Sequence, residues 1–489
     1  MRAMPAWLQQ LLPILILLAA VSVVLLRLPR VELGHSAAFR RRRFFNWFPL
    51  GLTYAFLYMG RYNLNVATSA MSEHTSNADF GKIFAWGTVT YAFAFLINGP
   101  LTDKLGGRKT ILIAAAGASL MNVLMGLVAW GVTAHGWAPP GGIVGSLSVL
   151  YAGNMYFQSF GAVSIVKVNS SWFHVRERGV LGGVFGILIS LGLYFAYDWS
   201  RFIVNVAPVQ WAFYIPAGVL LTFFVIEFLL VRDSPSQAGF EDFDTQDASS
   251  GDTGPALGVW PVFKKMITNP VMLVILGVEF CSGFLRNAVM QWYPKLAAAT
   301  GDTFVSLNWG MLLCVAGIMG GMFAGVISDR VFGSRRGPVS AVLYGGMTLG
   351  AVVAIFLIGN PSALGWAVVF MSLCVIGVHG MLSGTATMDF GGRKNAGLAV
   401  GIVDGAVYLG TAVQSVVLGH MLPSGEAATV LSNWKSWPWL MLPFCILGLV
   451  LATRVWNARP TTKAAPAPAT LPAAQPAASE EVARTGSER

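Results

Sequence analysis

The stretch GPLTDKLGGRK at residues 99–109 returns as GVISDRVFGSRR at residues 325–336, with the same order of glycine, acid and basic residues. The two copies begin 226 positions apart. Arg61 and Arg286 keep almost the same offset, because they lie 225 positions apart, each within a strongly apolar run. The chain is therefore an internal duplication in which each half carries one permanent cation inside an apolar segment.

The composition predicts a membrane protein. The 489 residues are 55% hydrophobic and 11% charged, and the mean hydropathy is +0.63, whereas soluble domains carry about 25% charged residues. Backbone groups in lipid must be hydrogen-bonded within the protein, so only helices or a closed barrel can span a bilayer. Apolar runs of helix length exclude the barrel, and we expect an all-α polytopic fold.

The net charge of +10 does not indicate nucleic-acid binding, because the basic residues alternate between connections. This alternation is typical of cytoplasmic loops in membrane proteins. The connections at 72–82, 133–142 and 359–365 are poor in Lys and Arg and should face outward. The basic residues in the alternate connections are Arg40 to Arg43, Lys104, Arg108, Lys109, Arg176, Arg178, Lys264, Lys265, Arg330, Arg335, Arg336, Arg393 and Lys394.

Apolar segments of about 20 residues suffice to cross a bilayer, and twelve are predicted. They lie near 44–71, 80–101, 108–133, 141–168, 179–200 and 206–231, then near 270–297, 302–328, 336–359, 363–388, 394–420 and 434–454. The domains predicted from them are a six-helix half at 44–231, a solvated cytoplasmic linker at 232–265, a second half at 266–457 and a disordered cytoplasmic tail at 458–489.

Residues 5–29 form one more apolar run. A cleaved signal peptide is the alternative, but the run is long, no small-x-small cleavage site ends it, and the following arginines would have to be translocated. The basic cluster instead keeps that junction inside. We therefore expect residues 1–43 to hold an extra transmembrane helix with an outward N-terminus, followed by a basic junction.

Twelve helices in two halves, with an acidic and basic loop after the second helix of each half, resemble the major facilitator superfamily. The matching loop residues include Asp103 and Arg108 in the first half, and Asp329 and Arg330 in the second. An acid at a helix end beside flanking cations can hold neighbouring helices together in one state and release them in another. These four residues are the predicted gating residues.

The two arginines predict a site for an anion. Arg61 has Tyr54 and Tyr58 seven and three positions upstream, near the same helix face. Guanidinium groups match phosphate oxygens in a bidentate manner, so arginines from opposite halves suit a phosphate or phosphate ester near the midplane. The alternative is structural pairing with an intramembrane acid, for which Glu279 is placed seven residues before Arg286. Charges inside a membrane usually mark a substrate path, which favours the anion site.

More specific motifs resemble the organophosphate:phosphate antiporters, which include bacterial glycerol-3-phosphate and hexose-phosphate transporters. The resemblance covers nearly all of residues 44–455. It implies that Arg61 and Arg286 bind phosphate, that four tyrosines line the pocket, and that phosphate leaving the cell drives uptake. The matching features are Arg61 with Tyr54 and Tyr58, Tyr91 before GPLTD, Arg286 before QWYP, SSWFHVRERG at 170–179, RDSPSQAG at 232–239, and the segment 391–410 with Tyr408.

Three positions depart from the glycerol-phosphate transporters of that family. Phe95 stands in place of a lysine, Ile189 in place of a histidine, and Tyr62 in place of a basic residue after Arg61. The pocket is therefore predicted to be less basic and more apolar. A substrate with less negative charge, or a bulkier one, fits that change.

Two titratable residues lie inside predicted helices of the second half. Asp404 is four residues before Tyr408, and His379 lies in the middle of VIGVHGML. Either residue can be structural, or it can contact the substrate or carry a proton. Two alternatives to phosphate exchange therefore stay open. One is a proton-coupled symporter of an organic anion, and the other is a transporter-like sensor of sugar phosphates.

Motifs for other chemistry are missing from the sequence. It contains no phosphate-binding GxxxxGK[ST], no HExxH metal pair and no nucleophile elbow, and its four cysteines lie far apart in apolar runs. We therefore expect no enzyme activity, no cofactor and no metal. The expected partners are a small anionic substrate, phosphate and the lipid bilayer, and we expect a monomer in a bacterial inner membrane.

Overall fold

The computed structural model describes residues 33–174, 177–245, 259–333, 335–382 and 396–457, together with the isolated positions 15, 19 and 22. Across these ranges the regular elements are all helices, which confirms the all-α prediction. The predicted N-terminal helix at 5–29 and the predicted tail from 458 lie outside the continuously described ranges, and both stay predictions.

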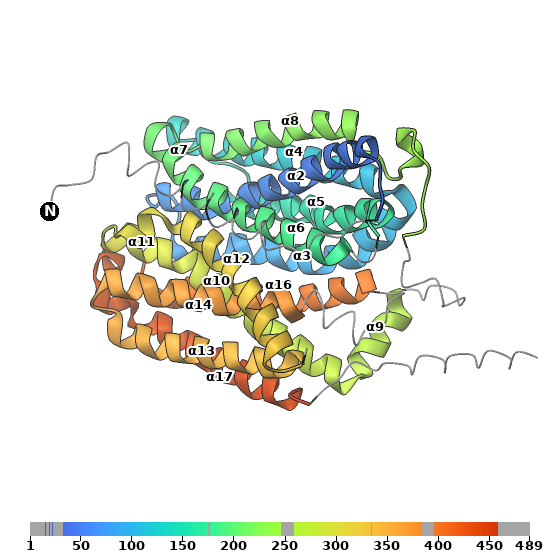
Figure 1. The fold of residues 1–489 in the computed structure, drawn as a ribbon. Coiled ribbons are helices and arrows are strands. Elements are labelled where there is room, and N and C mark those ends of the chain that lie inside the picture. Colours follow the sequence, from blue (N-terminus) through green and yellow to red (C-terminus); the bar gives the residue numbers. More distant parts are fainter. Residues whose placement is uncertain are drawn as a thin grey trace, which may run out of the picture.

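The helices form two groups that follow each other in the sequence. In Figure 1 the blue-to-green group lies above the yellow-to-red group. Helices α3 and α16 make the most extensive contact between the groups, and α6 packs on α12. The first group contains α2 (Ala37–Ala70), α3 (Asn77–Leu105), α4 (Gly107–His135), α5 (Gly142–Trp172), α6 (Arg178–Tyr194) and α8 (Trp211–Leu230). The second contains α10 (Pro270–Thr300), α12 (Trp309–Arg330), α13 (Arg336–Leu357), α14 (Pro361–Met381), α16 (Ala396–Met421) and α17 (Ser436–Arg454).

The lengths and hydropathies of these helices are those of a multi-pass membrane protein. Ten helical segments among the described residues are long and apolar enough to cross a bilayer. Two more long helices, α2 with 34 residues and α5 with 31, do not reach the same hydropathy. They are more polar because α2 carries Arg61 and α5 carries several side chains that bind it.

Helix boundaries differ from the sequence prediction where local chemistry extends a helix beyond its apolar run. Helix α2 begins at Ala37 instead of 44, because the Ser36 hydroxyl accepts a hydrogen bond from the Phe39 amide at 3.1 Å and caps the helix. The fifth predicted helix does not end at 200. It continues through the π-helical turn η2 (Phe195–Trp199) into α7 (Ser200–Val206). Conversely, a break at Asn308 separates the short α11 (Phe304–Leu307) from α12.

Pro294 shows how α10 and α12 are joined. Proline has no N–H group, so the carbonyl of the residue four positions earlier loses its partner within the helix. That carbonyl belongs to Met290, and the indole Nε1 of Trp309 donates to it at 3.2 Å. A free carbonyl inside a membrane must find a partner, so this hydrogen bond fixes the start of α12 against α10.

The two groups of helices are hydrogen-bonded to each other at the end that faces away from the basic connections. At this outer end, the Asn65 amide donates to the Gln291 carbonyl at 2.9 Å, and Asn77 donates to the Pro423 carbonyl at 2.6 Å. The Asp198 carboxylate accepts hydrogen bonds from the Gly310 and Met311 amides at 2.7 and 2.9 Å, capping α12. The outer end of the molecule is therefore closed.

Candidate functional site

Arg61 of α2 is fully buried near the middle of its helix. Its guanidinium donates to the Gln158 side-chain oxygen at 2.9 Å and to the hydroxyls of Tyr408 and Tyr91 at 2.6 and 3.3 Å. The guanidinium carbon also lies 4.7 Å from the ring centre of Tyr58 and 4.5 Å from that of Tyr91. All of these partners are neutral, so none of them compensates the positive charge of the arginine.

A row of polar side chains on α5 positions Arg61. Tyr151, Asn154 and Gln158 are spaced by three and four residues, which places them on one helix face. The Tyr151 hydroxyl donates to the Arg61 carbonyl at 3.1 Å, and Asn154 donates to the Gly60 carbonyl at 2.9 Å. Gln158 in turn donates to Asn154 at 3.1 Å. The sequence analysis missed this row, although its helical spacing within an apolar run was a usable signal.

Tyr408 connects the two groups of helices at the site. It belongs to α16, yet its hydroxyl accepts the short hydrogen bond from Arg61 of α2. Its ring centre lies 4.2 Å from that of Tyr91 on α3. Tyr54 is also buried and meets Tyr58 edge to face, with ring centres 5.4 Å apart. The structure thus brings the four predicted tyrosines together around Arg61.

Arg286 of α10 is 8% exposed and belongs to the same cluster. It lies near Tyr62, Tyr408 and Tyr58, and these three tyrosines also lie near Arg61. No described residue accepts a hydrogen bond from the Arg286 guanidinium, and its buried Nε has no partner there. Two cations from opposite halves thus share one set of tyrosines. Tyr62, which the sequence analysis names only as a departure from the family, lies near both Arg61 and Arg286.

Glu279 does not form the ion pair with Arg286 that its spacing suggested. Its Oε2 lies 3.2 Å from the Nδ1 of His379 on α14, and Glu279 is fully buried. Arg286 lies within its electrostatic reach, but the direct contact belongs to the histidine. Asp404 is close enough to His379 and Tyr408 to interact with both electrostatically. The structure therefore places His379 and Asp404 beside the site, together with Glu279, which the sequence offered only as a possible structural partner of Arg286.

Phe95 and Ile189 are two of the apolar or aromatic residues at which the sequence departs from the glycerol-phosphate transporters that it resembles. Phe95 is buried, and its ring centre lies 4.9 Å from that of Tyr91 in an edge-to-face contact. Ile189 is partly buried and packs against the hydrophobic core. Neither side chain adds charge to the cluster.

The predicted gating residues lie at the opposite end from the outer contacts. Asp103 accepts a hydrogen bond from Lys167 of α5 at 2.8 Å. The backbone amide of Arg108 donates to Asp233 at 2.7 Å, and its guanidinium donates to the Phe228 carbonyl at 2.6 Å. These bonds join helices within the first group. Arg330 is exposed at the end of α12, and the side chain of Asp329 lies outside the described part.

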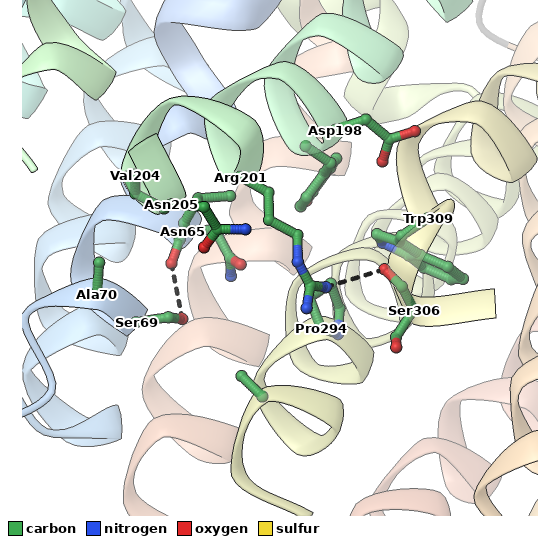
Figure 2. Close-up of a pocket in the computed structure, with 13 residues that line it drawn as sticks. Asn65, Ser69, Ala70, Asp198, Arg201, Val204, Asn205, Pro294, Ser306 and Trp309 are labelled. Atoms are coloured by element: carbon green, nitrogen blue, oxygen red, sulfur yellow. Dashed lines mark hydrogen bonds between the residues drawn. The ribbon is translucent and has the colours of Figure 1, made fainter. Parts of the chain in front are cut away.

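A cavity lies on the outer side of Arg61, between the two groups of helices (Figure 2). Its volume is about 240 Å³. The Arg201 guanidinium of α7 reaches across it to the Ser306 carbonyl at 3.1 Å and forms an ion pair with Asp302. The walls are formed by Asn65, Val66, Ser69, Ala70, Tyr197, Asp198, Val204, Asn205, Pro294, Ala298 and Trp309. None of these residues was predicted as a site residue.

The arrangement at the centre can bind an anion. A buried cation is costly unless a charge of opposite sign accompanies it. Neither guanidinium forms an ion pair with a carboxylate in the ranges that the structure covers. An anion bound between the arginines would supply the missing charge and accept hydrogen bonds from both halves.

Comparisons with known proteins agree with this geometry. Residues 50–415 match the profile of the Major Facilitator Superfamily. The glycerol-3-phosphate transporter of Bacillus subtilis (strain 168) is 24% identical over 450 residues, which cover 86% of this chain and 94% of that protein. The membrane sensor protein UhpC of Salmonella typhimurium (strain LT2) is 24% identical over 393 residues, covering 76% and 83% respectively.

The fold is also found among solved structures. A bacterial homologue of the human lysosomal transporter Spinster matches with a TM-score of 0.66 at 14% sequence identity, over 86% of this chain and 97% of that one. The resemblance described from the sequence motifs is confirmed by these matches.

Proposed function

The chain belongs to the major facilitator superfamily, and we propose that it exchanges an organic phosphate ester for inorganic phosphate by alternating access. It is a transporter rather than an enzyme. The proposal rests on one observation above the others. Arg61 and Arg286 are buried arginines from opposite halves, they lie near the same tyrosines, and neither forms a direct ion pair with an acid among the described residues, although Glu279 is within electrostatic reach of Arg286.

Exchange follows from the charge of this site. When the site is empty, the closed intermediate must enclose two cations with no bound anion, and their desolvation and repulsion oppose the change between the outward and inward states. A phosphate group with two negative charges neutralises them and contacts both halves, so it stabilises the closed intermediate between the outward and inward states. An anion must therefore accompany each crossing, in either direction.

The organic substrate is proposed to be of the glycerol-phosphate or sugar-phosphate class. The similarity to a glycerol-3-phosphate transporter supports this class. The ring of tyrosines around the arginines offers hydroxyl and aromatic surfaces to the organic part, and Phe95 adds an apolar wall. We place the protein in a bacterial inner membrane with its basic connections on the cytoplasmic side.

Uptake of radiolabelled phosphate into proteoliposomes tests the exchange. We expect uptake into vesicles loaded with phosphate to be about tenfold or more faster than into vesicles loaded with chloride, because the empty doubly charged site crosses poorly. Vesicles made with heat-denatured protein provide the background. Competition by glycerol phosphate, hexose phosphate and dicarboxylates then identifies the organic class. Equal initial rates with both internal anions would refute obligate exchange.

The cluster of Glu279, His379 and Asp404 supports a second candidate, a proton-coupled symporter of an organic anion. Titratable groups this close to a substrate site can carry a proton during the transport cycle. A protonophore separates the two proposals. Dissipating an imposed pH gradient would stop net uptake by a symporter, whereas phosphate exchange between equal pH values would continue. Binding without turnover in either assay would favour a sensor, the role stated in the name of the membrane sensor protein UhpC.

A further inference from the structure

Lys295 is a buried basic residue of α10 that the central site does not use. It lies nine residues beyond Arg286, about 13.5 Å further along the helix at 1.5 Å per residue, and it is 7% exposed. Its Nζ donates to the hydroxyls of Thr68 and Ser69 at 3.3 and 3.2 Å and lies 4.3 Å from the ring centre of Phe80. Lys295 forms no ion pair with any acid that the structure describes.

The partners of Lys295 belong to the opposite half of the protein. Thr68 and Ser69 end α2, and Phe80 begins α3. These contacts exist only while the outer ends of α2 and α10 are together. When the halves part at this end, the ammonium group loses its hydroxyl partners and becomes available to an anion at the outer entrance.

Polar residues lie between this entrance and the level of the central site on both helices. On α2, Arg61, Asn65 and Ser69 are spaced by four residues, and on α10, Asn287, Gln291 and Lys295 have the same spacing. Each set therefore shares a helix face. Asn65 and Gln291 are joined across the halves. Asn, Gln and Ser can join membrane helices by hydrogen bonds, but an ionisable residue such as Lys295 among them is typical of a path for a charged solute.

Several groups along this path have unused hydrogen-bonding capacity. Both polar side-chain atoms of Gln291, the side-chain oxygen of Asn65 and the hydroxyl of Tyr197 have no partner within the described protein, although each is buried. Asn65 and Tyr197 line the cavity of about 240 Å³ that Figure 2 shows. The cavity lies next to Ser69, to which Lys295 donates.

We propose that Lys295 is the outer anion-binding residue of the transport path, which binds the phosphate group of the substrate when the outer end opens and passes it to Arg286 and Arg61. The inference rests on the proposed function, because it takes the same anionic substrate. It adds a residue that acts from one face of the membrane only. When the outer ends are together, Lys295 donates its hydrogen bonds to the hydroxyls of Thr68 and Ser69 instead of to that anion.

The test uses the full chain in vesicles of known orientation and labelled inorganic phosphate as the probe. Loss of one charge-assisted hydrogen bond to phosphate should raise KM about tenfold or more. For Lys295→Gln we therefore expect this rise for phosphate added at the outer face, and a KM within about twofold of native at the inner face in inverted vesicles. Lys295→Arg should keep most of the outer affinity. The matched control is Lys82→Gln, which removes an exposed lysine near the start of α3 and should change neither constant.

Cysteine labelling supplies a measurement that does not depend on transport rates. The four native cysteines are buried, so Lys295→Cys introduces a thiol that an impermeant reagent reaches only when the outer end opens. We expect labelling from outside and protection by phosphate. An equal rise of KM at both faces, or an unchanged outer KM in Lys295→Gln, overturns the inference while the exchange proposal stands. Absence of phosphate exchange in the native chain overturns the proposed function, and with it this role of Lys295.

Discussion

Arg61→Lys and Arg286→Lys are each expected to abolish phosphate exchange in proteoliposomes, with a fall of about 100-fold or more in the rate at low phosphate. Lysine keeps the positive charge, so the loss comes from geometry. A guanidinium offers two parallel N–H groups to two phosphate oxygens, whereas an ammonium group is a point charge with no such fork. The variants therefore test bidentate binding and not attraction alone.

The two variants should differ in stability. Arg61 has hydrogen bonds to Gln158, Tyr408 and Tyr91, and lysine cannot keep all three. Arg286 has no hydrogen bond to any residue that the structure describes, so its replacement removes none. We expect Arg61→Lys to lower the unfolding temperature of the detergent-solubilised protein, and Arg286→Lys to leave it near the native value.

The matched control is Arg41→Lys, because Arg41 is exposed at the start of α2. It should keep both native exchange and native stability. Exchange at near-native rates in both Arg61→Lys and Arg286→Lys would contradict the phosphate-binding role and leave the arginines as structural residues. Loss of exchange in the Arg41 variant would indicate that the substitution acts through folding or insertion.

Gly283→Ala is expected to have the second large effect, on folding as well as on transport. A Cβ atom at Gly283 would lie 1.9 Å from the Val407 carbonyl oxygen, and one at Gly410 would lie 2.0 Å from the Phe280 carbonyl oxygen. Both obstacles are backbone atoms, so no side chain can move aside. Helices α10 and α16 would have to separate. Overpacking of this kind costs about 1–3 kcal/mol or more.

Separation of α10 and α16 would displace residues of the central site. Gly283 is three residues before Arg286, and Val407 is next to Tyr408. The Thr411 hydroxyl donates to the Gly283 carbonyl at 3.1 Å and accepts from Asn287 at 2.8 Å, and both bonds require the close crossing. We expect a lower unfolding temperature, a lower yield of monodisperse protein, and weak exchange by whatever protein remains folded.

Gly345→Ala is the matched control for this prediction. Gly345 lies within the membrane helix α13, but a Cβ atom there would meet nothing within 4 Å. The substitution should be neutral or slightly stabilising, because alanine favours helix more than glycine does. A Gly283→Ala variant as stable and as active as the Gly345 variant would show that α10 and α16 are less tightly packed than described.

The glycines also illustrate what pattern alone leaves open. Adjacent pairs such as Gly320 with Gly321 and Gly345 with Gly346 suggest close helix contacts. In the structure, a Cβ at Gly320 would lie 2.3 Å from the Leu373 carbonyl, whereas Gly321 and Gly345 face open space. Single glycines such as Gly283 and Gly410 form the closest crossing. A sequence shows that a residue is small, but only the position of the neighbouring helix decides whether the two backbones come close at that residue.

The partner of Glu279 likewise could not be predicted from its spacing in the sequence. Its spacing of seven from Arg286 places both on a similar helix face, and this suggested an ion pair. Its contact is with His379, which lies 100 positions later in the sequence. Spacing along one helix predicts which side a residue faces. It does not predict which helix packs on that side, and buried acids take the partner that the packing presents.

The amino-acid sequence by itself determined the membrane location, the duplicated helical architecture and the two central arginines, because hydropathy, positive-inside charge and repeated motifs are local properties of the chain. Only the tertiary structure decided how Arg61 is held, by Gln158 from α5 and Tyr408 from α16. It also decided the partner of Glu279, the outer cavity and the contacts of Lys295. These features arise where helices far apart in the sequence pack together, so their side-chain contacts depend on the tertiary arrangement and not on spacing along the chain.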